Sequence, residues 1–280
     1  MSKVIISTDS PSDIGTALAE KWGVAVIPLH VILNGEDRLD GVNVTPEEIV
    51  DNYKATKALP STSAIPVGEY EDFFADLTKN GDSVVHIALS SGISSSCRNA
   101  MIAAGDFDNV YVVDSKHLTT GIVLLINKAV KMAQGGMSAE EIAKSVEALA
   151  DKADTSFVLD NLEFLAKGGR CSAVSALGAN ILGIRPSLEM RGGTLSMCKK
   201  YRGKIEKVQA QYVEERMNSA EYDDELAIFT YSPMDEAQAQ ALCDIVKNSG
   251  KFKEVLMMKA GCTIVSHCGP NCAAFIALKK

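Results

Sequence analysis

The chain has 280 residues, with 28 Lys or Arg against 36 Asp or Glu, so its formal net charge is -8. Hydrophobic residues make up 46% and charged residues 23%, which excludes a disordered chain, and the acidic balance argues against duplex nucleic acid as a partner. This length favours two packed domains over one. No apolar run approaches the ~18 residues of a membrane span, and no signal-peptide pattern is present, so we expect a cytoplasmic protein.

The first half of the chain alternates strand and helix patterns, which predicts a parallel sheet covered by helices. Apolar strand patterns fall at residues 4–7, 24–29, 84–89 and 109–113. Helices are expected after the turn 8–13, at the capping box Thr45-Pro46-Glu47-Glu48, after Pro66, over 121–134 and after Ser138.

The second half has a different pattern. A short helix is expected over 161–167, and strands at 187–190 and 194–197 flank the hairpin signal Arg191-Gly192-Gly193. Helices over 205–218 and 234–248 and strands at 226–231, 254–258, 263–267 and 273–278 complete this half. We therefore predict the class α/β, with a parallel-sheet α/β domain over 1–155 and an α+β domain with a mixed sheet over 156–280.

The seven cysteines are odd in number and lie in a chain without an export signal, so reduced thiols are expected. Cys262, His267, Cys268 and Cys272 could suggest zinc, but their spacing fits no zinc pattern. Buried small hydrophobic side chains are the favoured interpretation, and we expect no metal.

Three hydroxyl-rich loops, at 7–13, 61–63 and 90–96, are expected at the carboxyl ends of strands, where open α/β sheets bind ligands. Hydroxyls and free N–H groups at the start of a helix suit an anion, although Ser and Thr also serve simply as caps and turn formers. Three such loops favour a shared anion site.

A serine hydrolase is the alternative, because Gly92-Ile93-Ser94-Ser95-Ser96 nearly matches the nucleophile elbow. Ser94 would be the nucleophile and His267 the base, oriented by Asp114 or Asp160. Ser96 replaces the last glycine of the elbow, however, and no glycine-rich oxyanion segment precedes it. A scaffold that binds no ligand is a third hypothesis.

Six segments in the same order resemble the signature loops of the DegV family, from about residue 3 to the C-terminus. They are Thr8–Asp13, Ser61–Pro66, Ser90–Ser94, Val113–Lys116, Leu162–Arg170 and Ser266–Pro270. The resemblance implies a two-domain protein without catalytic residues or cofactor. Such proteins bind one long-chain fatty acid, such as palmitate or oleate, with the acyl chain buried and the carboxylate near the domain junction. Some members present that carboxylate to a bacterial fatty acid kinase, which makes an acyl phosphate.

By position, Thr62 and Ser94 match the family's hydroxyl ligands of the carboxylate, His267 matches the histidine near the head group, and Arg170 matches the arginine after the double glycine. Two positions depart from the pattern: Ala64 stands where the family has Gln, and Ser95 stands where it has Gly. We expect Arg170 at the mouth of the site and His267, placed at the end of a strand, closer to the carboxylate.

Overall fold

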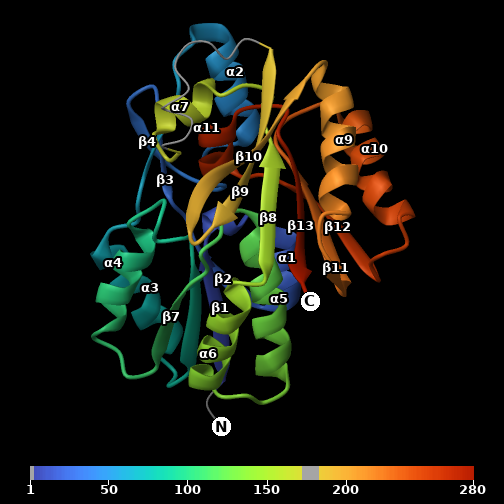
Figure 1. The fold of residues 1–280 in the computed structure, drawn as a ribbon. Coiled ribbons are helices and arrows are strands. Elements are labelled where there is room, and N and C mark those ends of the chain that lie inside the picture. Colours follow the sequence, from blue (N-terminus) through green and yellow to red (C-terminus); the bar gives the residue numbers. More distant parts are fainter. Residues whose placement is uncertain (1–2, 172–182) are drawn as a thin grey trace.

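The computed structural model describes residues 3–171 and 183–280 (Figure 1). A four-stranded parallel sheet forms the lower half in Figure 1, with the strand order β2-β1-β6-β7. Its strands are β1 (Val4–Asp9), β2 (Val24–Ile27), β6 (Ser83–Ala88) and β7 (Val110–Asp114), so the predicted parallel sheet is confirmed.

Helices cover both faces of the parallel sheet. One layer contains α3 (Val67–Thr78) and α4 (Ser96–Ala104), the other contains α5 (Thr120–Gln134) and α6 (Ala139–Ala150), and α1 (Thr16–Trp22) packs on β2. A short 3-10 helix, η1 (Ser10–Ser12), follows β1. The predicted capping box at Ser138 forms, because its hydroxyl accepts from the Glu141 amide while the Glu141 carboxylate accepts from the Ser138 amide.

A six-stranded sheet forms the upper half, in the order β10-β9-β8-β13-β11-β12. The predicted mixed sheet is confirmed, whereas the strand over 153–158 and the strand order were not predicted. Its strands are β8 (Ala153–Val158), β9 (Ile184–Arg191), β10 (Thr194–Arg202), β11 (Tyr222–Tyr231), β12 (Glu254–Lys259) and β13 (Ala273–Lys279). Helices α9 (Ile205–Met217) and α10 (Glu236–Asn248) pack on its outer face. The predicted division after residue 155 falls inside β8 and stays a prediction.

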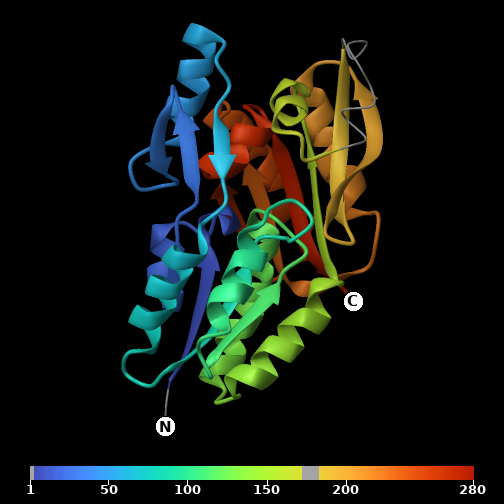
Figure 2. The ribbon, with the colours of Figure 1, turned by 90° about the vertical axis from the view of Figure 1, so that its left-hand side faces the viewer.

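Helix α5 lies between the two sheets, because it contacts β1 and β6 of the parallel sheet and β8, β11 and β13 of the mixed sheet (Figure 2). Its residues from Thr120 to Asn127 are all buried, which fits its nearly continuous apolar sequence. The approach to β8 is close: a Cβ at Gly121 would lie 2.1 Å from Thr155 Oγ1. One hydrophobic core therefore extends through both halves.

A small antiparallel sheet, in the order β4-β3-β5, was not predicted. It consists of β3 (His30–Leu33), β4 (Glu36–Leu39) and β5 (Ser61–Ser63), and α2 (Pro46–Thr56) begins at the predicted capping box between β4 and β5. Asn34 and Gly35 join β3 to β4 with φ of 54° and 84°, the conformation of a tight hairpin turn. Val31 and Ile49 pack with Val265 in a separate small core, which attaches this sheet to the C-terminal half.

The predicted strand over 263–267 is wrong, because these residues belong to helix α11 (Cys262–Cys268). Thr263, Ile264 and Val265 are β-branched and favour a strand locally. The amides at the start of α11 instead find carboxylate acceptors in the N-terminal half, and these tertiary contacts decide the conformation. The predicted short helix before the double glycine is confirmed as α7 (Glu163–Gly168).

Candidate functional site

The four predicted site residues lie together. Thr62, Ser94, Arg170 and His267 line one cavity, called here the polar pocket. Thr62 comes from β5, Ser94 from the loop before α4, Arg170 from the segment after α7, and His267 from α11. Both halves of the chain therefore build this pocket, at their junction.

Helix α11, which carries His267, is held by two buried carboxylates of the N-terminal half. Asp40 accepts from the amides of Cys262 and Thr263, at 2.8 and 3.2 Å, and Asp13 accepts from the amide of Gly261 at 2.9 Å. Burial raises the pKa of Asp13 well above its ordinary value, although its hydrogen bond from Thr119 opposes this. Acceptors at the start of a short helix satisfy amides that have no partner inside the helix.

His267 and Thr62 form the central contact of the polar pocket, with 2.8 Å between Nε2 and Oγ1. Burial, together with the positive charge of Arg170, lowers the pKa of His267 to about 4, so the ring is neutral at neutral pH. Its Nδ1 is buried without a hydrogen-bond partner among the described residues, and a Cβ at Gly168 would lie 2.2 Å from this atom. The ring thus lies directly against the backbone of Gly168.

The direction of the bond between His267 and Thr62 follows from these surroundings. A proton on Nδ1 would be a buried donor without an acceptor near the cation Arg170, whereas a lone pair there is less costly. We therefore assign the proton to Nε2, which donates to Thr62 Oγ1. The hydroxyl proton of Thr62 is then left to donate to an acceptor in the pocket.

Ser94 lies where α4 begins. Its Oγ accepts from the amide of Ser96 at 3.1 Å and lies 3.0 Å from the Ser96 hydroxyl. Ser94 and Ser95 line the polar pocket, so the positive end of the α4 dipole is directed at it. Two hydroxyls and a helix N-terminus therefore favour an anion here.

Arg170 lies at the outer side of the polar pocket. Its side chain is exposed and donates to the Gly168 carbonyl at 2.6 Å. It also lines a wide surface depression, the open cleft, with Ser91, Arg98 and Thr194. The open cleft and the polar pocket share Ser94 and Arg170, so the pocket communicates with the surface.

An apolar cavity continues the polar pocket inward. Leu118, Leu165, Leu195, Ile264 and His267 line both spaces. Further in, the wall is formed mainly by side chains of the mixed sheet, of α11 and of the segments next to α11, among them Phe157, Ala260, Cys268, Cys272 and Ala274. The three spaces thus form a series from exposed cation to hydroxyls to apolar wall.

The residues of the hydrolase alternative do not form a catalytic triad. His267 Nε2 bonds to Thr62 rather than to Ser94, and no carboxylate of the described residues orients its Nδ1. Asp114 accepts instead from Ser91 at 2.5 Å, and Asp160 pairs with Arg185 at 3.1 Å. General-base activation of Ser94 needs a histidine within hydrogen-bond reach and a partner that orients it.

Two further expectations are settled by the structure. Among the described residues, the loop 7–13 does not contribute to the polar pocket, and its Asp13 carboxylate binds the start of α11 instead. Residues 61–63, expected as a loop, form the strand β5. The prediction that Cys262, Cys268 and Cys272 are buried is confirmed. No group of three potential metal ligands occurs in residues 3–171 and 183–280, and no helix there is long and apolar enough to cross a membrane.

Sequence reasoning missed two features of this site. The double glycine was a sequence signal for a left-handed φ or for a close approach of the backbone. In the structure Gly169 has the left-handed φ, and Gly168 makes the close approach to His267. The support of α11 by Asp13 and Asp40 spans more than 200 residues of sequence and left no local signal.

Fold and site together define an α/β protein with two main sheets, in which an apolar internal cavity continues a polar pocket at the junction of the halves. A family profile described as "Uncharacterised protein, DegV family" matches residues 3–280. The chain belongs to the DegV family. A DegV domain-containing protein of Caldanaerobacter subterraneus subsp. tengcongensis is 32% identical over all of both chains.

Two solved structures extend this likeness. One, described as showing fatty acid binding of a DegV family protein from Thermus thermophilus, has a TM-score of 0.91 at 29% identity and covers 99% of this chain and 100% of its own. The other, a stearic acid-binding protein from Eubacterium ventriosum, has a TM-score of 0.83 at 26% identity, with 100% and 99% covered.

Proposed function

We propose that this protein binds one long-chain fatty acid, with the acyl chain in the apolar cavity and the carboxylate in the polar pocket. The observation that carries the proposal is the shared wall: Leu118, Leu195 and Ile264 line both spaces, so one elongated amphiphile can occupy them together. The fatty acids named for the relatives from Thermus thermophilus and Eubacterium ventriosum support it.

The apolar cavity supplies the affinity. Each buried methylene contributes about 0.8 kcal/mol, so the ~14 methylenes of palmitate offer about 11 kcal/mol before entropic costs. A buried carboxylate without partners would cancel much of this gain. The net charge of -8 cannot attract an anion, so the partners have to be local.

The hydroxyl of Thr62, oriented by His267, and that of Ser94 are these partners. In this arrangement His267 acts as a neutral donor to Thr62 rather than as an imidazolium, in agreement with its lowered pKa. Arg170 stands further out and adds positive potential at the mouth of the pocket.

We further propose that a fatty acid kinase phosphorylates the bound carboxylate. Support comes from the open cleft, which leads from the surface to Ser94 and presents the cations Arg98 and Arg170 beside that path. Two arginines at this place suit the charge of a phosphoryl group. The protein itself would act as the binding subunit, in the cytoplasm and without a cofactor.

Mass spectrometry of organic extracts from the purified protein tests the ligand. We expect a C14–C18 fatty acid at close to one per chain. Extracts without fatty acid, together with no uptake of added palmitate or oleate, would refute the proposal and favour a scaffold.

Substitutions in the polar pocket test the placement of the carboxylate. Thr62→Ala and Ser94→Ala should each weaken oleate binding by about 1–3 kcal/mol, because a buried acceptor loses its donor. Thr62→Ser keeps the hydroxyl and is the matched control. Covalent labelling of Ser94 by a fluorophosphonate probe would instead support the hydrolase.

Arg170→Ala separates binding from presentation. The arginine is exposed at the mouth, so fatty acid affinity should stay within about threefold while acyl-phosphate formation with a cognate kinase falls strongly. His267→Ala should impair both. If Arg170→Ala abolished binding and left turnover of the residual complex normal, the two roles would be reversed.

A further inference from the structure

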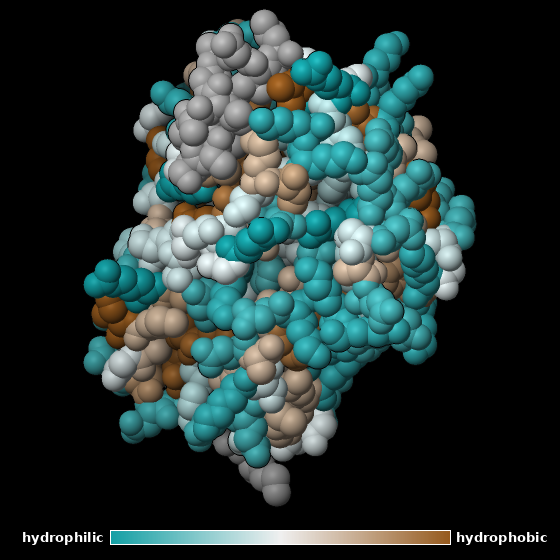
Figure 3. Space-filling view, in the orientation of Figure 1, coloured by the Kyte–Doolittle hydropathy of each residue, from teal (hydrophilic) through white to brown (hydrophobic). Residues whose placement is uncertain are grey.

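A second cavity lies beside the β9–β10 hairpin and takes no part in the proposed function. Gly192 and Gly193 of the hairpin turn line it, whereas the next two residues, Thr194 and Leu195, line the open cleft. The opposite wall comes from the N-terminal half, where Lys116 and His117 precede α5. Figure 3 shows mostly hydrophilic residues over the middle of this face of the molecule. We call this space the charged cavity.

Cations outnumber carboxylates in the charged cavity. Its lining contains four cations, Lys116, Arg191, Arg216 and Lys279, against three carboxylates, Asp151, Asp154 and Glu189. The protein as a whole carries a net charge of -8, so this local excess of positive charge runs against the composition. Each cation also pairs with a carboxylate of the lining: Lys116 with Asp151, Arg191 and Arg216 with Glu189, and Lys279 with Asp154. One positive charge is left over, and it favours a small anion.

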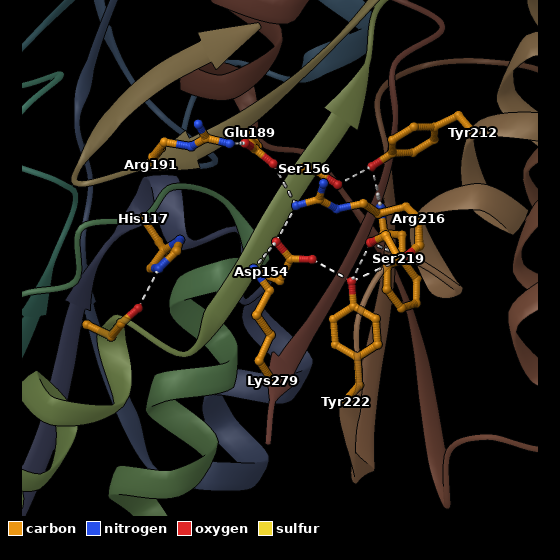
Figure 4. Close-up of polar contacts among 12 residues, drawn as sticks. His117, Asp154, Ser156, Glu189, Arg191, Tyr212, Arg216, Ser219, Tyr222 and Lys279 are labelled. Atoms are coloured by element: carbon orange, nitrogen blue, oxygen red, sulfur yellow. Dashed lines mark hydrogen bonds and ion pairs between the residues drawn. The ribbon is translucent and has the colours of Figure 1, made fainter. Parts of the chain in front are cut away.

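The carboxylates hold the deepest cation in place (Figure 4). Arg216 lies between Asp154, to which it donates, and Glu189 at 2.9 Å. The Tyr222 hydroxyl also donates to Asp154, at 2.5 Å. Burial alone would raise the pKa of Asp154, but Arg216 and Tyr222 bring it below its ordinary value, so the carboxylate stays charged. The buried Arg216 Nε has no hydrogen-bond partner among the described residues, so this network is not complete without a further acceptor.

His117 supplies a different kind of group. It is only 4% exposed, and its Nε2 donates to the Ala150 carbonyl at 2.8 Å. Burial lowers its pKa, so the ring is neutral and its other nitrogen, Nδ1, is an acceptor. This Nδ1 has no partner among the described residues, and Figure 4 shows it on the side of the ring turned toward Asp154.

A ligand that satisfies this lining has to accept from Lys and Arg side chains and donate one proton to an imidazole nitrogen. Inorganic phosphate does both, because at neutral pH it is an anion that keeps at least one P–OH group. Sulfate has the same size and shape but no proton to donate. We propose that the charged cavity is a binding site for inorganic phosphate, held by Arg191, Arg216 and Lys279 and by a hydrogen bond to His117 Nδ1.

Isothermal titration at pH 7 in a buffer without phosphate or sulfate tests this site. We expect saturable binding of one inorganic phosphate per chain, with sulfate weaker by about tenfold or more because it cannot donate to His117. Glycerol 3-phosphate should also bind more weakly than free phosphate. The proposal would be overturned if glycerol 3-phosphate bound more tightly than phosphate, if phosphate and sulfate bound with equal affinity, or if phosphate showed no saturable binding.

Three variants locate the anion. Arg191→Gln removes a mostly exposed side chain and should weaken phosphate binding at least about fivefold. Lys144→Gln makes the same change of charge on the exposed face of α6 and should leave binding unchanged. His117→Gln keeps a donor for the Ala150 carbonyl and should abolish the preference for phosphate over sulfate. Wild-type binding by Arg191→Gln would refute the site even if His117→Gln failed to fold.

Discussion

Gly168→Ala tests whether the contact between His267 and the backbone after α7 sets the geometry of the polar pocket. The added Cβ would lie 2.2 Å from His267 Nδ1 and 3.0 Å from Cε1, whereas ordinary contacts begin at 3.4 Å. The ring therefore has to move by about 1 Å. Because the ring is confined between Gly168 and Thr62, it can relieve this contact only by rotating. The rotation breaks its 2.8 Å hydrogen bond to the Thr62 hydroxyl.

The expected loss follows from that bond. Thr62 without His267 is no longer oriented toward the carboxylate, and the ring leaves a buried polar atom unsatisfied, which costs about 1–3 kcal/mol. Oleate affinity should therefore fall about 5- to 150-fold in a fluorescent fatty acid displacement assay. Gly68→Ala is the control, because Gly68 lies in α3 with nothing within 4 Å of an added Cβ and no left-handed φ. It should leave oleate affinity unchanged.

A double-mutant cycle separates the mechanism from general damage. If Gly168→Ala acts through the imidazole, it should cause no further loss of affinity in a His267→Ala background. Equal losses with and without the histidine would show that the substitution disturbs the pocket by another route. Unchanged oleate affinity of Gly168→Ala alone would refute the reasoning altogether.

Three other predictions concern the same region. The pKa of His267 is about 4 in the folded protein and about 6.5 when unfolded, so the unfolded state binds the extra proton between these values and stability is lost as the pH falls through that window. Urea unfolding should show wild type losing about 2 kcal/mol more than His267→Gln between pH 7 and pH 5, and parallel losses would contradict the low pKa. Asp40→Asn should lower the free energy of unfolding by about 1–3 kcal/mol, because one amide at the start of α11 loses its acceptor. Asp235→Asn, at the exposed start of α10, is the control and should lower it less. Equal losses in the two variants would argue against the role of Asp40. Ala274→Leu narrows the apolar cavity and should shift binding from C18 toward C12–C14 acids, and an unchanged chain-length profile would place the acyl chain elsewhere.

Most of the fold was predictable because the strands of the parallel sheet carry continuous apolar runs and the helices begin at recognisable caps. The Asn34-Gly35 turn was an equally clear local signal for the β3–β4 hairpin, but the flanking strands are only four residues long and half polar. Helix α11 was not predictable from local sequence, since β-branched residues occupy a helix whose first amides are held by Asp13 and Asp40.

The site residues were predicted from motifs, but their partnership was not. Thr62 and His267 are 205 positions apart, and only the docking of the small sheet against α11 brings them into hydrogen-bond distance. The lowered pKa of His267 likewise arises from burial and from Arg170, which only the folded structure places near the ring. The neutral state of His267 therefore follows from the folded environment and not from the sequence motif.

Under the proposed function, the position of α5 between the two sheets limits how a lipid can be loaded. Since α5 packs against both sheets, a hinge motion that separated the two halves would expose the buried residues of this helix. Under the proposed function, a fatty acid would enter from the surface past Arg170 and Ser94 with its methyl end leading, so that the carboxylate arrives last. Dissociation would follow the reverse route, and each additional methylene would have to leave through the polar pocket. Residence time should therefore lengthen with each carbon of the chain, while the rate of capture depends chiefly on the opening.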